Sequence, residues 1–166
     1  MPKENLLGPI GQGVEMSPQT MIYEMNACGA CALGLMEEAM DMTMAYVGSR
    51  MHKDGMPFPM RYDVMRVRLM ENVADINFVR GATYAAALAY DAGQPNIVDS
   101  LLFKASCFKL AERVTSTCID LEGGVGLSKS VGLERLYRDA KVGLIGGGQY
   151  DFIMSNTGAM RFMGIA

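Results

Sequence analysis

The sequence predicts an all-α protein, an up-down four-helix bundle with an additional short C-terminal helix. Apolar residues recur at three- and four-residue spacing along three long stretches that contain no proline. Methionine accounts for 16 of the 166 residues and aromatic residues for only 8%, a composition that favours packing between helices over a β-sandwich. No segment alternates apolar and polar side chains convincingly, so no strand is expected.

The first long helix is expected to begin at Ser17 and Pro18, because serine is a good N-cap and proline suits the first helical position. Residues 1–16 contain too many glycines and prolines for a helix and are expected to form a linker. The helix should run to about Arg50, before the glycine and prolines of 52–59. Its buried stripe is expected to comprise Met21, Cys28, Cys31, Ala32, Leu35, Met42 and Tyr46.

The remaining helices are expected over the ranges 60–91, 97–121, 130–141 and 151–163. Asn96 can cap the third long helix, and Gly123 with Gly124 should end it, as glycine commonly does. The glycines of 146–148 separate the two short helices. Three long helices and two short ones complete the bundle.

Composition excludes several classes of function. The net charge is -3 and the pI about 5.2, and lysine and arginine do not cluster, which argues against a nucleic-acid partner. No run of eighteen apolar residues is present, so no membrane span is expected. The N-terminus lacks the basic start and apolar stretch of a signal peptide, which predicts a cytoplasmic protein.

Histidines and thiols offer little support for a metal site. The one histidine, His52, lies in a turn without a glutamate three residues before it, which excludes the di-iron site of helical bundles. The pair Cys28 and Cys31 has redox or zinc spacing but falls inside a helix, and Cys107 and Cys118 are expected in the core. No metal is therefore expected, and a bundle holding zinc through four thiols stays a third alternative.

Glu24 is the most informative single residue. It stands one turn after Met21 and one turn before Cys28, on the predicted apolar stripe. Partial burial there would raise its affinity for a proton, as a catalytic base requires. The alternative is a glutamate that turns outward and interacts favourably with the helix N-terminus. The 146–148 glycines open onto a helix, where free N–H groups can hold an anion or an oxyanion.

Several segments together resemble the flavin-dependent acyl-CoA dehydrogenases. They are residues 2–8 followed by Gly11-Gln12-Gly13, residues 27–34, Tyr46 with Arg50, Lys104, the glycine cluster 123–126 and, above all, the octapeptide 134–141. The resemblance covers essentially the whole chain but only the C-terminal helical domain of that family. Residues 1–16 resemble the exit from an upstream β-domain, and residues 17–166 resemble the helical bundle.

The resemblance implies FAD-dependent α,β-dehydrogenation of an acyl-CoA thioester. In that reaction a glutamate removes the α-proton while the β-hydrogen passes as hydride to the flavin. The electrons then go to an electron-transferring flavoprotein. The resemblance also implies a homodimer or homotetramer.

The resemblance assigns the base to Glu24. In most members the catalytic glutamate follows the position of Ile145-Gly146, where this sequence has Gly147. The isovaleryl- and long-chain-type members place it instead on the first long helix, at the position of Glu24, and Met25 stands where an arginine usually follows. Gly147 would still offer its backbone N–H to the thioester carbonyl.

The flavin contacts carry over unevenly. Arg50 matches an arginine that reaches the FAD pyrophosphate of a neighbouring subunit, and Arg66 stands at one of two glutamine positions in the second helix. Asp120 replaces the glutamine before Gly123 and Gly124, so a pyrophosphate there needs Arg66 or another cation to offset it.

Two further positions belong to the cofactor site by resemblance. Gln149 and Asp151 stand where the family has threonine and glutamate beside the flavin. Two interpretations follow from these substitutions. The chain is the C-terminal domain of an acyl-CoA dehydrogenase, inactive by itself, or it is a non-catalytic assembly subunit whose flavin contacts have degenerated.

Overall fold

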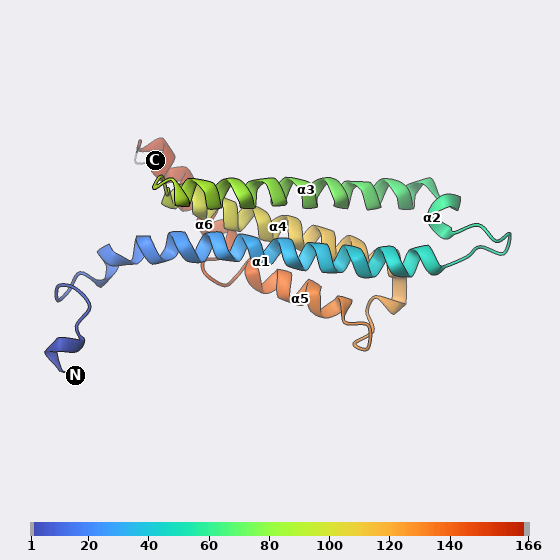
Figure 1. Cartoon of the computed structure of the whole chain (residues 1–166), viewed down its shortest axis with the longest axis horizontal. Coiled ribbons are helices and arrows are strands. Elements are labelled where there is room, and N and C mark those ends of the chain that lie inside the picture. The colour runs from blue at the N-terminus through green and yellow to red at the C-terminus, as the bar shows by residue number, and fades with distance from the viewer. Residues whose placement is uncertain (1, 165–166) are drawn as a thin grey trace.

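The computed structural model describes residues 2–164, and its long helices pack into one bundle, from which the segment around residues 3–5 projects (Figure 1). The elements are η1 (Lys3–Asn5), α1 (Gly13–Ser49), α2 (Phe58–Arg61), α3 (Asp63–Asp91), α4 (Ile97–Glu122), η2 (Gly123–Val125), α5 (Leu133–Gly143) and α6 (Tyr150–Phe162). The described residues contain no strand, only an isolated bridge between Met51 and Pro57. The predicted all-α class is confirmed.

The helix α4 lies at the centre of the arrangement. It packs against α1, α3, α5 and α6. Figure 1 shows α1 and α3 side by side in front of α4, with α5 along the opposite edge of α1. Thr43 of α1 contacts Glu122 of α4, and the N-terminal half of α1 reaches Phe103 of α4, so these two helices run parallel. The helix α3 lies between α1 and α4 in the sequence and runs antiparallel to both, as an up-down bundle requires.

The buried face of α1 differs from the predicted stripe. The residues that α1 buries are Ile22, Met25, Gly29, Ala32, Met36, Ala39, Met40, Thr43 and Val47. Of the predicted stripe only Ala32 is buried, while Cys31 is exposed. The buried face is shifted by one residue from the prediction, because α1 carries apolar residues on several faces and packs against α3, α4 and α5.

The start of α1 also differs from the prediction. The helix begins at Gly13, inside the expected linker, and continues through Pro18. Proline has no N–H for the carbonyl of Val14, but the Ser17 hydroxyl donates to that carbonyl at 2.8 Å. A side-chain donor thus replaces the missing backbone donor. The linker contains a second helical piece, the short η1.

The other boundaries match the prediction more closely. The expected helix 60–91 is divided at Tyr62, whose backbone is extended, into α2 and α3. The Asn96 side chain caps α4 by accepting hydrogen bonds from the N–H groups of Val98 at 2.8 Å and Asp99 at 3.2 Å. Gly123 ends α4 with a φ of 66°. These two helix-end signals are confirmed.

Gly29 permits the close packing of α1 on α4. A methyl carbon added at Gly29 would lie 2.1 Å from Cε1 of Phe103. Such a distance is far inside van der Waals contact, so the aromatic ring occupies the space that any other side chain would need. Gly34, also on α1, has no neighbouring atom within 4 Å of such a carbon.

We expect Gly29→Ala to lower the free energy of unfolding by about 1–3 kcal/mol, because the Phe103 ring must move out of a packed interface. The matched variant Gly34→Ala should instead raise it by up to about 1 kcal/mol, since alanine favours the helix. Urea unfolding followed by circular dichroism measures both. Equal effects of the two variants would contradict this account of the packing.

Candidate active site

Two residues from distant parts of the chain meet at one point. The helix α1 carries Glu24, and the turn between α5 and α6 carries Gly147. A methyl carbon added at Gly147 would lie 3.4 Å from Oε1 of Glu24 and 3.2 Å from Cε of Met25. The structure therefore brings together the two predicted catalytic residues.

The Glu24 side chain is exposed in this chain. The predicted partial burial is wrong because the buried face of α1 is centred on Ile22 and Met25 rather than on Met21 and Cys28. The carboxylate instead lies at the edge of the bundle, above the Gly147 turn. An exposed carboxylate beside a backbone turn is open to a ligand from the solvent side.

The turn that carries Gly147 has a defined backbone. Gly147 and Gly148 have φ values of 64° and 108°, which favour glycine. The N–H of Gly146 donates to the carbonyl of Val142 at 2.8 Å, and the N–H of Tyr150 donates to that of Leu144 at 2.9 Å. In the described part of the chain, the N–H of Gly147 donates to no backbone carbonyl. This N–H is therefore available to an acceptor from outside the turn.

Lys104 completes this site, and reasoning from the residues did not identify its role. It is only 1% exposed, and its Nζ donates to the carbonyls of Gly146 at 2.6 Å and Gly148 at 2.9 Å. Burial lowers the pKa of Lys104, while the nearby Cys28 and Glu24 act to raise it. A lysine on the apolar face of the third helix was the signal that could have found it.

Gln149 and Asp151 lie next to this turn. The Gln149 side chain caps α6 by accepting from the N–H of Phe152 at 2.9 Å, and it donates to Asp151 at 2.8 Å. Both predicted cofactor residues are therefore on the same side of the bundle as Glu24.

The other predicted cofactor residues lie at the opposite end. Arg50 is the C-cap of α1, about 40 Å along the helix from Glu24. Its guanidinium lies 4.6 Å from the ring centroid of Phe58 and 5.6 Å from that of Tyr46. Arg50 belongs to none of the ion pairs within residues 2–164. It is an exposed cation that rings hold in place.

Arg66 and Asp120 are occupied within the chain. Arg66 donates to the carbonyls of Pro59 at 2.9 Å and Met60 at 3.0 Å and pairs with Asp63. Asp120 accepts from Arg68 of α3 at 2.6 Å. The cation that offsets Asp120 is therefore Arg68, whereas Arg66 was named as the candidate from the sequence.

Gly123 and Gly124 follow Asp120 after two residues and begin the turn η2. With Arg50, they make one end of the bundle a second group of predicted cofactor residues, remote from Gln149 and Asp151. One compact cofactor cannot touch both groups of a single chain.

Comparison with known proteins gives the family. Residues 11–163 match the family described as acyl-CoA dehydrogenase, C-terminal domain. The chain belongs to this family.

Relatives and solved structures agree with that assignment. The mitochondrial short/branched chain specific acyl-CoA dehydrogenase of Bos taurus is 30% identical over 145 residues, which cover 87% of this chain and 33% of the relative. The structure of butyryl-CoA dehydrogenase from Megasphaera elsdenii has a TM-score of 0.91 at 28% identity, covering 98% of this chain and 42% of that one. A structure described as an electron transferring flavoprotein of Acidaminococcus fermentans covers 95% of this chain and 41% of that one, with a TM-score of 0.88 and 26% identity. The chain spans only about a third to two fifths of these proteins.

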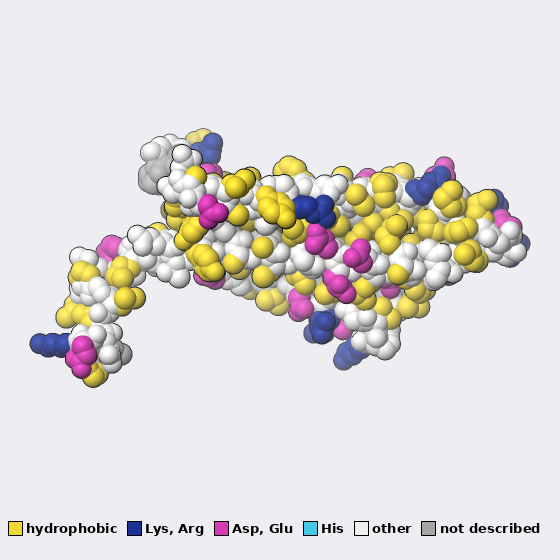
Figure 2. Space-filling view, viewed as in Figure 1, with side chains coloured by type: hydrophobic (Ala, Val, Ile, Leu, Met, Phe, Trp, Pro, Cys, Tyr) yellow, Lys and Arg dark blue, Asp and Glu magenta, His cyan; other side chains and the backbone are white. Residues whose placement is uncertain are grey.

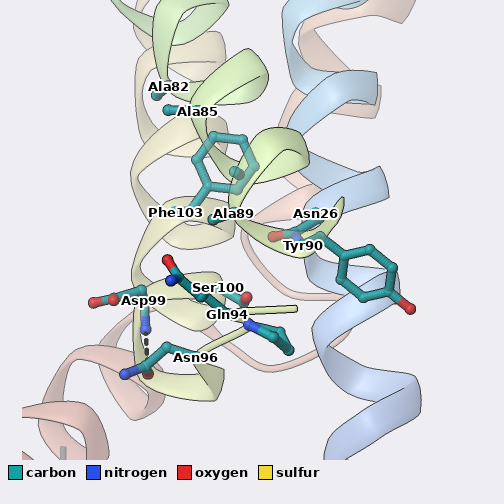
Figure 3. A pocket seen from close by; sticks show the side chains of 12 residues that line it. Asn26, Ala82, Ala85, Ala89, Tyr90, Gln94, Asn96, Asp99, Ser100 and Phe103 are labelled. Carbon is teal, nitrogen blue, oxygen red and sulfur yellow. Dashed lines mark hydrogen bonds between the residues drawn. The ribbon is translucent and has the colours of Figure 1, made fainter. Parts of the chain in front are cut away.

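The acyl-CoA dehydrogenase domain also has an open cleft of about 290 Å³ between α1, α3 and α4 (Figure 3). Alanines of α3 and the Phe103 ring line one part, and polar side chains at the start of α4 line the other. The α1 wall is Asn26, which stands two positions from Glu24 and so on a different face of the helix. The cleft is therefore separate from the Glu24 site.

The thiols do not form a metal centre. All four cysteines are free, with Cys107 and Cys118 buried. Within residues 2–164, no three side chains of histidine, cysteine, aspartate or glutamate come together to hold an ion. The zinc alternative is wrong for this part of the chain. None of the described helices is long and apolar enough to cross a membrane.

The domain buries a carboxylate beside the η2 turn. Glu122 is 2% exposed, and its Oε1 accepts a hydrogen bond from the Thr43 hydroxyl at 3.1 Å. Its Oε2 has no hydrogen-bond partner within residues 2–164. Burial raises the pKa of Glu122, and the Thr43 hydrogen bond opposes that rise. The sequence did not single out Glu122, because it is the last residue of α4 and an acid at a helix end next to glycines is expected to be exposed.

We expect Glu122 to make the domain less stable as pH rises. The native state holds the proton of Glu122 more tightly than the unfolded chain, so unfolding is increasingly favoured as pH rises above the ordinary value of 4.5. Glu122→Gln removes this titration and should raise the free energy of unfolding at pH 8 by about 1 kcal/mol or more, with less effect at pH 5. Thermal unfolding at both pH values measures the difference.

The control is Glu38→Gln, which alters an exposed carboxylate of α1. It should change stability little at either pH. A Glu122→Gln effect that is the same at pH 5 and pH 8 would contradict a buried, titrating carboxylate.

Proposed function

We propose that this chain is the C-terminal domain of an FAD-dependent enzyme that dehydrogenates acyl-CoA thioesters between the α- and β-carbons, with Glu24 as the base. The observation that carries the proposal is the approach of Glu24 Oε1 to the Gly147 turn. The turn before α6 has Gly147 where most members of the family have the catalytic glutamate, and Glu24 of α1 places a carboxylate next to that position. The family membership supports the reaction class.

The geometry suits removal of a proton next to a carbonyl. The Glu24 carboxylate accepts the α-proton, while the N–H of Gly147, unused by the turn, donates to the thioester carbonyl. That hydrogen bond stabilises the negative charge that develops on the oxygen as the proton leaves. The exposure of Glu24 means that other parts of the complete protein must exclude water from the site.

The residues present fit one portion of FAD. Arg50 is exposed, held by Phe58 and unpaired with any acid of residues 2–164, which suits a phosphate from a neighbouring subunit. Gly123 and Gly124, at the same end of the bundle, have open space around them, because no atom lies within 4 Å of an added methyl carbon at either. When bound, FAD supplies the acceptor for the hydride that leaves the β-carbon.

The activity belongs to a longer protein. The chain spans about a third of its Bos taurus relative, so we expect it to be inactive by itself. The segment before α1, which begins at Gly13, then serves as the linker from a β-domain, and the helices from α1 to α6 form the helical domain. The proposed partners are an acyl-CoA substrate and an electron-transferring flavoprotein. A cytoplasmic location stays a prediction, since a named relative is mitochondrial.

A second interpretation is a non-catalytic assembly subunit with degenerate flavin contacts. The observation that favours it is the occupation of Arg66 by Asp63 and of Asp120 by Arg68. The reading frame upstream of Met1 discriminates the two: coding sequence for a β-domain supports the enzyme. A genuine start codon without a partner gene supports the assembly subunit.

We expect Glu24→Gln in the complete protein to leave the flavin content unchanged and to lower turnover of an acyl-CoA by at least about 100-fold, because the amide cannot accept the α-proton. Exchange of the substrate α-hydrogen with deuterated water measures the step directly. Glu38→Gln, on the exposed face of the same helix, is the matched control. Undiminished exchange in Glu24→Gln would remove Glu24 as the base.

We also expect the isolated chain to form dimers or tetramers. Hydrophobic side chains lie exposed along α3 (Figure 2), namely Val64, Val67, Met70, Phe78, Tyr84 and Leu88. Phe78→Lys should shift the assembly toward monomer, whereas Phe162→Lys on α6, at a side chain 96% exposed, should not. Sedimentation velocity measures the mass, and a clean monomer of the wild-type chain at micromolar concentration would contradict self-association.

A further inference from the structure

Lys104 is a buried cation without an ion pair in the described residues. Its side chain is 1% exposed, and no carboxylate oxygen of residues 2–164 lies within ion-pair distance of Nζ. The hydrogen bonds of Nζ go to two backbone carbonyls, those of Gly146 and Gly148. Burial of a cation is costly unless its hydrogen bonds are satisfied. A methionine would pack at this position at lower cost, so the ammonium has a use beyond packing.

The two carbonyls flank Gly147 on either side. Three consecutive glycines lose more conformational freedom on ordering than other residues, and here two of them adopt left-handed backbone angles. One ammonium group that binds both carbonyls fixes the peptide plane between Gly146 and Gly147 and the plane that follows Gly148. The turn is thereby latched to α4, the central helix of the bundle.

This latch sets the direction of the Gly147 N–H. The peptide between Gly146 and Gly147 is trans, since no described peptide bond is cis. In a trans peptide the carbonyl oxygen and the following N–H point in opposite directions. Because the Gly146 carbonyl points to Lys104, the Gly147 N–H points away from the ammonium and out of the core.

The charge of Lys104 also acts on the α1 side of the site. A methyl carbon added at Gly147 would lie 4.0 Å from Cε of Lys104 and 3.4 Å from Oε1 of Glu24, so the cation, the turn and the carboxylate form one cluster. The thiol of Cys28 is the other titratable group of α1 that the Lys104 charge reaches. Burial raises the pKa of Cys28, and Glu24 and Cys31 raise it further, whereas Lys104 lowers it.

We propose that Lys104 is a positioning residue that orients the Gly147 N–H toward the substrate carbonyl and places a positive charge beside Glu24. The inference rests on the proposed dehydrogenation, and it assigns a role to a residue that touches no reacting atom. Lys104 orients the Gly147 N–H by binding the Gly146 carbonyl of the same peptide group.

The first test uses the chain as it is and does not depend on activity. Lys104→Met removes both hydrogen bonds, so amide hydrogen exchange of Gly146 and Tyr150 should accelerate by about tenfold or more. The matched control is Arg113→Met, which alters an exposed cation of the same helix that pairs with Asp75. Exchange of these amides in Arg113→Met should equal that of the wild type.

The second test uses the complete protein. Lys104→Met should lower kcat by about 10- to 100-fold with little change in KM for the acyl-CoA, because orientation of the donor is lost while binding surface remains. Lys104→Gln keeps a donor group, so its amide exchange rates and its kcat should lie between those of the wild type and those of Lys104→Met.

The outcomes separate the latch from the reaction. Unchanged exchange at Gly146 and Tyr150 in folded Lys104→Met would overturn the latch, whatever the activity. Faster exchange with an unchanged kcat would leave a structural lysine and overturn the positioning role. A complete wild-type protein without turnover, combined with faster exchange in the variant, would instead reject the proposed dehydrogenation. If Lys104→Met does not fold, Lys104→Gln gives the same readouts.

Discussion

The parallel packing of α1 along α4 is the constraint on which the rest of the structure depends. It is close because Gly29 has no side chain, so the Phe103 ring of α4 packs directly on the backbone of α1. At one end this packing brings Glu24 over the turn that Lys104 holds. At the other end it places the Thr43 hydroxyl against the Glu122 carboxylate. One helix pair thus positions both the candidate base and the buried acid.

The two buried ionisable groups of this interface differ in how well they are satisfied. Lys104 donates to two carbonyls of a glycine turn that has few other constraints, so the cost of burial is offset by the order it imposes. Glu122 has one hydrogen bond and one oxygen without a partner in the described residues. The ammonium organises a site at the edge of the bundle, whereas the carboxylate sits in a core that would be more stable without its charge.

The predicted cofactor contacts show how neighbouring residues redefine a motif. Asp120 would repel a pyrophosphate as an isolated side chain, but Arg68 from α3 neutralises it. Arg66 is also a cation, but its guanidinium donates to two carbonyls of α2 and so links α3 to α2. Arg50 keeps an exposed guanidinium because aromatic rings, rather than acids, hold it. Among these three charged residues, Arg50 is therefore the one whose charge no acid of residues 2–164 neutralises.

The sequence by itself determined the helices, their caps and the family. Periodicity over long segments without proline, the Asn96 cap and the glycine that ends α4 are local signals, and local hydrogen bonding enforces them. The buried face of α1 was not determined in this way, because apolar residues lie on several faces of this helix and their spacing alone does not identify the buried one. The start of α1 was missed for a local reason as well, since the Ser17 hydroxyl substitutes for the donor that Pro18 lacks.

Only the tertiary structure decided which side chains share a site. Glu24, Lys104 and Gly147 come from α1, α4 and the turn before α6, and no spacing along the chain relates them. Their meeting depends on the packing of α1 on α4 and on hydrogen bonds from a buried ammonium. The same is true of the Arg68 partner of Asp120 and of the burial of Glu122. Charge and burial are properties of neighbours in space, which a chain acquires only on folding.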